Sequence, residues 1–191
     1  MTFAWILIIL LVWYGTEKWL EKELDTDRMR SFFIMTTPFF ILFLCQAFGA
    51  QENWTMMLKT GLFISLCFLV GCYDYYTCTI PRFSHYLILC TALIGSEKII
   101  ALLIAGVLLS LPFLILYLVA FFSKKKSWIF GLGDLLFIAS GSFFLGIVPG
   151  FVGIMSGLLL FLVWSAVKGK KEQLPLAPAL SIGYMLGLYI M

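Results

Sequence analysis

The sequence predicts an all-α membrane protein: one domain over residues 1–191, folded as a polytopic helix bundle with about eight apolar segments, of which seven or eight span the bilayer. Two observations predict this class. Hydrophobic residues make up 62% of the chain and charged residues only 12%, whereas a soluble domain carries about 25% charged residues. The charged residues are also clustered, so they divide the chain into long apolar runs. This composition excludes a soluble enzyme, a disordered protein, a coiled coil and a nucleic-acid-binding domain.

The apolar runs approach the length that a bilayer requires. A spanning helix needs roughly 20 apolar residues, and the runs at residues 3–14 and 83–95 are shorter than that. Residues 17–30 carry charges of both signs and are expected to form a solvent-exposed amphipathic segment. Pro112 predicts a kink in the longest run. The eight runs cover residues 3–14, 31–50, 60–80, 83–95, 99–122, 131–148, 150–167 and 174–191.

The lysines and arginines alternate between the two sides of the predicted bundle. Only Lys59 and Lys98 fall on one side, and the other eleven fall in the loops after the first, third, fifth and seventh runs. Because basic loops stay in the cytoplasm, this split predicts a multi-pass protein of the cell membrane with both termini outside. The eleven are Lys18, Lys22, Arg28, Arg30, Arg82, Lys124, Lys125, Lys126, Lys168, Lys170 and Lys171.

Asp74 and Asp134 are the only acidic residues inside the apolar runs. An intramembrane carboxylate is costly and is functional by default. In the predicted topology Asp74 lies near the exit of the third run and Asp134 at the entry of the sixth, so both lie at a similar depth near the cytoplasmic face. Two adjacent carboxylates can share one proton and perform aspartic-protease chemistry. The structural alternative is a pair held by backbone donors or by a cation.

Glycines and prolines flank the two acids. Two glycines precede Asp134, and a glycine lets another backbone approach closely. An Ile-Pro pair follows Asp74 and should break the helix there. Two more prolines stand at the cytoplasmic entry of the last run. The residues expected to shape a substrate cleft are therefore Gly131, Gly133, Ile80, Pro81, Pro175 and Pro178.

The cysteines and the histidine predict no metal centre. The five cysteines form no CxxC pair, and they are expected to be small buried hydrophobic residues. His85 is the single histidine of the chain. It is expected to lie at the membrane interface or to have its hydrogen bonds satisfied.

The combination Asp74-x5-Ile80-Pro81, Gly131-x-Gly133-Asp134 and Pro175-x-x-Pro178 resembles the type IV prepilin peptidase family, over residues 50–191. The resemblance implies a membrane aspartic protease of the GxGD type, with Asp74 and Asp134 as its catalytic pair. It also implies prepilin or pseudopilin substrates, cut at the cytoplasmic face after a short basic leader, in pilus, competence or protein secretion systems.

The chain resembles a short form of this family. It lacks the N-terminal tetracysteine segment that binds zinc in larger members, so the resemblance implies no metal. Many members also methylate the new N-terminus with S-adenosylmethionine. Arg82 stands where the family often has Asn or Asp, and Leu136 stands where a lysine is common. These two departures leave methylation open.

Two other functions share parts of the pattern. Tyr73-Asp74, Gly131-x-Gly133-Asp134 and Pro178-Ala179-Leu180 also resemble the motifs of presenilins and signal peptide peptidases, which place their aspartates on consecutive helices. A proton-coupled transporter could use the same two acids as a relay. It predicts acids near the bilayer midplane and an internal repeat, and the sequence shows neither.

Overall fold

The computed structural model describes residues 14–15, 18, 22, 54–122, 131–168 and 174–191. The expected amphipathic segment, the apolar run at residues 31–50, most of the run at 3–14 and the three consecutive lysines therefore lie outside the described residues, apart from single positions. The chain divides into two units, Met1–Ser65 and Leu66–Met191. Every contact discussed below lies within the second unit.

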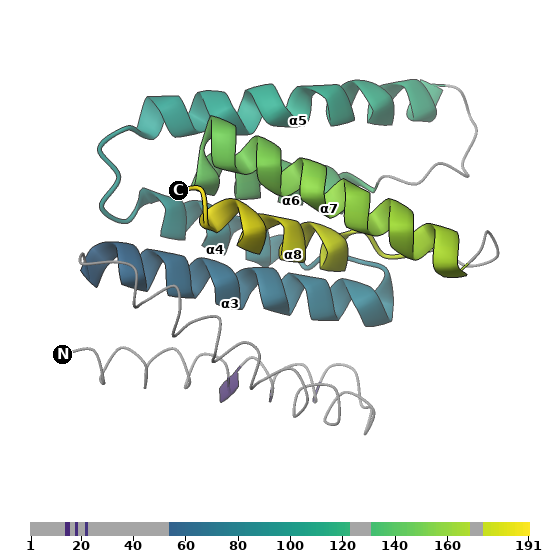
Figure 1. Cartoon of the computed structure of the whole chain (residues 1–191), viewed down its shortest axis with the longest axis horizontal. Helices are drawn as coiled ribbons and strands as arrows, with labels where there is room; N and C mark the ends of the chain where they lie inside the picture. Colours follow the sequence, from purple (N-terminus) through teal and green to yellow (C-terminus); the bar gives the residue numbers. More distant parts are fainter. Residues whose placement is uncertain (1–13, 16–17, 19–21, 23–53, 123–130, 169–173) are drawn as a thin grey trace. The chain divides into compact units, whose positions relative to one another are not determined.

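The prediction of an all-α protein is confirmed for the part of the chain that the structure describes, which holds helices and no strand (Figure 1). Apolar residues dominate each helix, and the breaks between helices fall at proline, glycine or charged positions. The helices are α3 (Trp54–Thr77), α4 (Arg82–Leu93), α5 (Ile99–Phe122), α6 (Leu132–Leu145), α7 (Ile147–Lys168) and α8 (Ala177–Leu188).

Three of the described helices, α3, α5 and α7, are long and apolar enough to cross a membrane. The chain is therefore a membrane protein, with fewer spans in its described part than the sequence predicts. The runs at residues 131–148 and 174–191 hold helices of only 14 and 12 residues. At about 1.5 Å per residue, such helices are shorter than the hydrocarbon core of a bilayer. Gly146 ends α6, because its φ of 85° cannot continue a helix.

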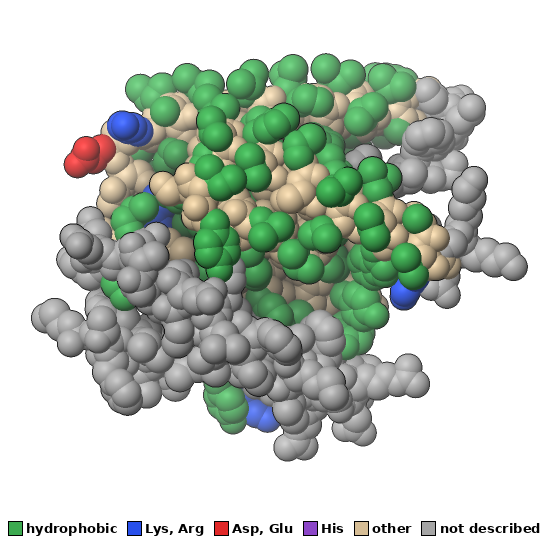
Figure 2. Space-filling model, viewed as in Figure 1, with side chains coloured by type: hydrophobic (Ala, Val, Ile, Leu, Met, Phe, Trp, Pro, Cys, Tyr) green, Lys and Arg blue, Asp and Glu red, His purple; other side chains and the backbone are tan. Residues whose placement is uncertain are grey.

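Helix α5 presents an apolar surface to its surroundings. Of its 24 residues only Ala105, Gly106 and Phe113 are buried, and most of the exposed ones are leucine, isoleucine, valine or phenylalanine. Figure 2 shows hydrophobic side chains gathered over α5 and α7. An apolar surface of this extent is stable against lipid rather than water. Pro112 lies inside α5, which continues through it as one helix.

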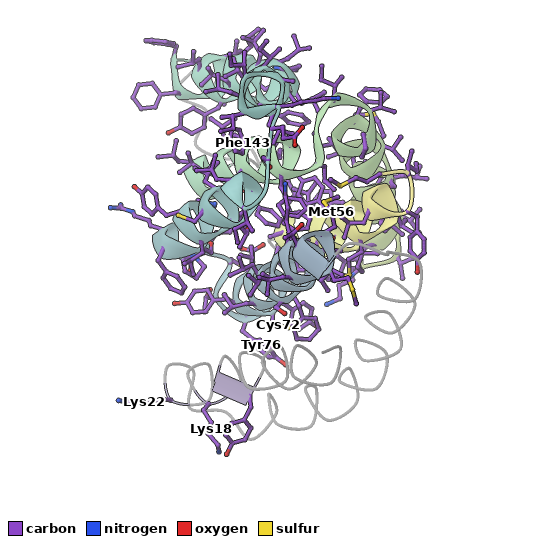
Figure 3. The ribbon with its side chains drawn as sticks, turned by 90° about the vertical axis from the view of Figure 1, so that its left-hand side faces the viewer. Lys18, Lys22, Met56, Cys72, Tyr76 and Phe143 are labelled. Carbon is purple, nitrogen blue, oxygen red and sulfur yellow. The ribbon has the colours of Figure 1, made fainter. Side chains whose placement is uncertain are left out.

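Helices α7 and α8 pack with their backbones in contact, side by side in Figures 1 and 3. Both helices carry a Gly-xxx-Gly pattern, Gly153 with Gly157 on α7 and Gly183 with Gly187 on α8. A Cβ placed on Gly157 would lie 2.9 Å from the Cα of Leu180, and one on Gly183 would overlap the carbonyl oxygen of Gly153. The short helix α8 is thereby fixed against the long helix α7.

Candidate active site

Asp74 lies near the C-terminal end of α3, three residues before the helix ends, and its side chain is only 4% exposed. Its Oδ2 atom accepts a hydrogen bond of 3.0 Å from the backbone N–H of Ala177, the first residue of α8. A helix N-terminus carries unpaired N–H groups and partial positive charge, so it stabilises a carboxylate. The last helix of the chain therefore holds the first acid.

Close packing of α8 on α3 makes this hydrogen bond geometrically available. A Cβ on Gly71, one turn before Asp74, would lie 3.3 Å from the Cα of Pro178 and 3.1 Å from Oγ of Ser181. Oγ of Ser181 donates a 2.7 Å hydrogen bond to the carbonyl of Cys67, one further turn back along α3. A small residue and a hydroxyl thus allow the start of α8 to reach the end of α3.

Asp134 is the third residue of α6 and is held by its own helix. Its Oδ2 atom accepts a 2.9 Å hydrogen bond from the backbone N–H of Gly131, the residue that caps the helix. This is the carboxylate half of a capping box. A Cβ on Gly131 would lie 3.5 Å from Oδ2 of Asp134 and 3.9 Å from the backbone nitrogen of Gly133, both ordinary contact distances. The first glycine of the GxGD pattern therefore has room beside it.

The Ile80-Pro81 pair lies in the bend between α3 and α4, where the sequence predicts a helix break. Cys78 has a φ of 51°, and its N–H bonds to the carbonyl of Asp74 at 2.8 Å, which closes α3. The bend brings Ile80 against Gly133, where an added Cβ would lie 3.2 Å from the Cβ of Ile80. The second glycine of the pattern is therefore the one that permits a close approach.

Both carboxylates line one cavity of about 280 Å³. Among the described residues, no hydrogen bond reaches the second oxygen of either carboxylate. Each acid thus has one oxygen fixed by a backbone N–H and one left for other partners. The lining residues are Asp74, Cys78, Thr79, Ile80, Arg82, His85, Gly131, Leu132, Gly133, Asp134 and Leu136.

Of the residues expected to shape a cleft, three line this cavity and three do not. Gly131, Gly133 and Ile80 are in the wall. Pro81 instead caps α4 with φ −63° and ψ 128°. Pro175 and Pro178 lie before and at the start of α8, where they precede and follow the N–H donor to Asp74 rather than contacting the cavity.

The electrostatic field of the two acids reaches Cys78, which follows α3 in the bend. Partial burial raises the pKa of the Cys78 thiol, and the negative charges of Asp74 and then Asp134 raise this pKa further. Both carboxylates therefore act on one atom at the edge of the cavity. Two acids in one small cavity, with water access through the exposed bend, can exchange a proton with each other and with a bound water.

His85 lies elsewhere than the sequence analysis expects. Its hydrogen bonds are not satisfied: its side chain is 5% exposed, and neither ring nitrogen has a hydrogen-bond partner among the described residues. It lies in the first turn of α4 and lines the cavity with the two acids. The sequence could have indicated this position, because His85 follows Ile80 by five residues and so lies at the start of the helix after the bend.

Within the described part of the chain, no three histidine, cysteine, aspartate or glutamate side chains converge closely enough to hold a metal ion. The cavity is lined by the two acids, by four further residues with polar side chains and by apolar residues; the four are Cys78, Thr79, Arg82 and His85. No protein-family model, no curated protein and no solved structure matches the chain.

Proposed function

We propose that the chain is an aspartic endopeptidase in which Asp74 and Asp134 form the catalytic pair. The observation that carries the proposal is the meeting of two carboxylates, from helices distant in sequence, in one cavity of an otherwise apolar protein. Acids are costly in such surroundings and are retained there for chemistry. Each acid accepts one backbone hydrogen bond, as the structural alternative also predicts, but each keeps a second oxygen that no described residue binds.

The proposed reaction is general acid–base hydrolysis of a peptide bond. The pair shares one proton, because like charges at short range do not both ionise easily. The ionised carboxylate takes a proton from water, which attacks the scissile carbonyl carbon, and the protonated carboxylate donates to the carbonyl oxygen. The pair titrates as a unit, so neither role is assigned to one residue.

The proposed substrates are prepilins or pseudopilins, which lose a short basic leader at the cytoplasmic face of the cell membrane. This part of the proposal rests on the motifs that resemble the prepilin peptidase family, and on the distribution of Lys and Arg, which favours termini outside the cell. The acids lie at the ends of α3 and α6 rather than in their middles, which favours a site that a soluble leader can reach over a midplane proton relay. N-methylation with S-adenosylmethionine is an additional activity that the same experiment measures.

The test is co-expression of the full chain with a pilin-like protein, followed by mass measurement of the pilin N-terminus. Removal of the leader is expected with the wild-type chain. Asp74→Asn and Asp134→Asn are each expected to reduce cleavage by roughly 10³-fold or more while the protein still inserts into the membrane. Glu97→Gln removes an exposed carboxylate outside the cavity and is the matched control, expected to cleave normally.

This measurement, together with assays of membrane-spanning peptides and of proton uptake, separates the alternatives. A leader removed without added mass indicates a protease alone, and the added mass of one methyl group indicates both activities. Substantial cleavage by either Asp→Asn variant would exclude the pair as the catalytic group. Cleavage of membrane-spanning peptides but not of prepilins would favour the presenilin-like alternative. Proton uptake without any cleavage would favour the transporter.

A further inference from the structure

Three side chains form an aromatic and basic cluster at the C-terminal ends of α3 and α7, and none of them lines the cavity of the two acids. The rings of Tyr75 on α3 and Trp164 on α7 are stacked, with centroids 6.0 Å apart and an interplanar angle of 13°. Nζ of Lys168 lies 5.7 Å from the centroid of the Trp164 ring, within the range of a cation–π interaction. Tyr75, Trp164 and Lys168 are named the end cluster below.

The length of α7 places the end cluster at a membrane surface. Helix α7 has 22 residues and ends at Lys168, so it is about 33 Å long and just crosses a hydrocarbon core of about 30 Å. Tyr75 lies in the last turn of α3, a second helix that can cross a membrane. Tryptophan and tyrosine are enriched at the headgroup level of a bilayer, because each has an apolar ring and a polar N–H or O–H group.

The surroundings of Lys168 combine a positive charge with an apolar surface. The side chain is exposed, and no carboxylate among the described residues pairs with it. Residues 168–172 hold three lysines and one glutamate in the sequence, so this segment has a net charge of +2. On the preceding turns of α7, Leu159, Leu162 and Val163 are 64%, 64% and 57% exposed, within the hydrophobic surface of Figure 2. An anionic head attached to apolar chains matches both parts.

We propose that the end cluster binds an anionic phospholipid. Its phosphate lies at the ammonium group of Lys168, the rings of Trp164 and Tyr75 lie at the level of its glycerol, and its acyl chains lie along the exposed apolar side of α7. Asp74 immediately precedes Tyr75 in the sequence, so the bound headgroup lies at the end of α3 that holds the first acid. The proposal is independent of the peptidase function.

The first test measures how phosphatidylglycerol and phosphatidylcholine with the same acyl chains bind to the full chain in detergent micelles, by native mass spectrometry. The wild type should bind phosphatidylglycerol more tightly, and Lys168→Gln should reduce this preference roughly fivefold, the contribution of about one lysine at a membrane surface. Lys168→Arg keeps the charge and should keep the preference. Lys98→Gln is the matched control, because Lys98 is an exposed lysine beside another apolar helix, α5, and is outside the end cluster.

The second test determines the depth of the end cluster in a bilayer. Bromine atoms on a lipid quench tryptophan fluorescence over a short distance, so phosphatidylglycerol brominated near the glycerol is compared with phosphatidylglycerol brominated near the ends of its acyl chains. The contribution of Trp164 is the difference between the wild type and Trp164→Phe. This contribution should be quenched more strongly by bromine near the glycerol.

A third measurement distinguishes a lipid from a free phosphate. Glycerol phosphate has the anionic group without acyl chains, and it should not displace bound phosphatidylglycerol. Displacement by glycerol phosphate at equal concentration would overturn the proposal in favour of a site for free phosphate. A dimer that binds no lipid would overturn it in favour of a second copy of the chain.

Three further results would overturn the proposal: equal binding of the two lipids by the wild type, an unchanged preference in Lys168→Gln, and equal quenching by the two brominated lipids. None of these measurements involves the cleavage of a peptide. A failure of this proposal therefore leaves the peptidase proposal standing, and a failure of the peptidase proposal leaves this one standing.

Discussion

The two acids of the cavity are supported in different ways. Asp134 is held by the N–H of Gly131, three residues away, and the start of α6 supplies everything that this hydrogen bond needs. Asp74 is held by the N–H of Ala177, 103 residues away, and depends on α8 lying directly against α3. One carboxylate is thus positioned by local structure and the other by tertiary packing. A change in packing should therefore disturb Asp74 before it disturbs Asp134.

Among substitutions that change packing, the largest effect is expected at Gly133, which lies against Ile80 of the bend after α3. Gly133→Val adds atoms to a position where even a Cβ would lie 3.2 Å from Ile80, so the bend and the start of α6 must separate. Misplacing reacting groups by about 1 Å can cost about 10²-fold in rate. Cleavage per folded molecule, measured with the membrane level of the protein, should fall by that order.

Leu132→Ala is the control for this change, because Leu132 is 54% exposed and the substitution adds no volume. It should reduce cleavage only slightly. Normal specific activity of Gly133→Val would mean that the glycine is dispensable for the geometry of the site, and a parallel fall in protein level and activity would point to helix packing alone.

A smaller effect should distinguish the hydrogen bond from Ala177 to Asp74, which depends on tertiary packing, from the local hydrogen bond from Gly131 to Asp134. Gly71→Ala places a methyl group 3.3 Å from the Cα of Pro178, so α8 must move by a few tenths of an ångström and carry the N–H of Ala177 with it. Cleavage is expected to fall roughly tenfold. Gly131→Ala makes the same change beside the local support, where the space is adequate, and should cleave almost normally. Equal losses in the two variants would contradict the comparison.

The reactivity of Cys78 offers a measure of both carboxylates that does not depend on activity. The charges of Asp74 and Asp134 raise the pKa of this thiol and so reduce its thiolate fraction at a given pH. At mildly alkaline pH, Asp74→Asn should accelerate alkylation of Cys78 roughly threefold, and Asp134→Asn should accelerate it less. Peptide mass spectrometry measures the extent of alkylation at Cys78 over time.

Cys90 is the internal reference for this measurement, since it is exposed and lies outside the cavity. Its alkylation rate should not change in either variant, and Glu97→Gln should leave both cysteines unchanged. Unchanged Cys78 labelling in both Asp→Asn variants would place the carboxylates too far away to act on the bend.

The smallest effect concerns stability. Ser181→Ala removes the 2.7 Å hydrogen bond from α8 to the carbonyl of Cys67 and should lower the free energy of unfolding by about 1 kcal/mol. Ser140→Ala removes a buried hydrogen bond that stays within α6 and should cost less. Denaturant titration in mixed micelles compares the two. A larger loss for Ser140→Ala would mean that α8 contributes little to holding α3.

What the sequence could predict follows the same division between local and tertiary support. The glycines and acid of the GxGD pattern lie within four residues, and an acid at the third helical position is a capping pattern that can be read directly. The apolar run at residues 99–122 coincides with α5, because hydropathy along a continuous stretch of sequence is also a local property. In contrast, the donor to Asp74 is a backbone N–H, and no side chain in the sequence marks it.

The features that the sequence analysis predicts wrongly are the span over residues 131–148 and the surroundings of His85, which hydropathy along the chain does not determine. Hydropathy predicts one span over residues 131–148, but the positive φ of Gly146 divides that run between α6 and α7. His85 is one of the few polar residues in the apolar run at residues 83–95, and the bend at residues 78–81 brings it beside the acids. Both depend on a turn of the backbone.

The glycine contacts between α7 and α8 have a mechanical consequence. Where backbones touch without intervening side chains, as at Gly153 and Gly183, there are no rotamers to rearrange and no slack to absorb sliding. These two helices must therefore move as one rigid piece, and the N–H of Ala177 moves with them. The cavity is lined by the end of α3, the bend after it and the first turns of α4 and α6, so a widening of the cavity moves these segments relative to one another. Asp74 is hydrogen-bonded to this rigid pair through Ala177, whereas the hydrogen bond of Asp134 lies within its own helix, α6.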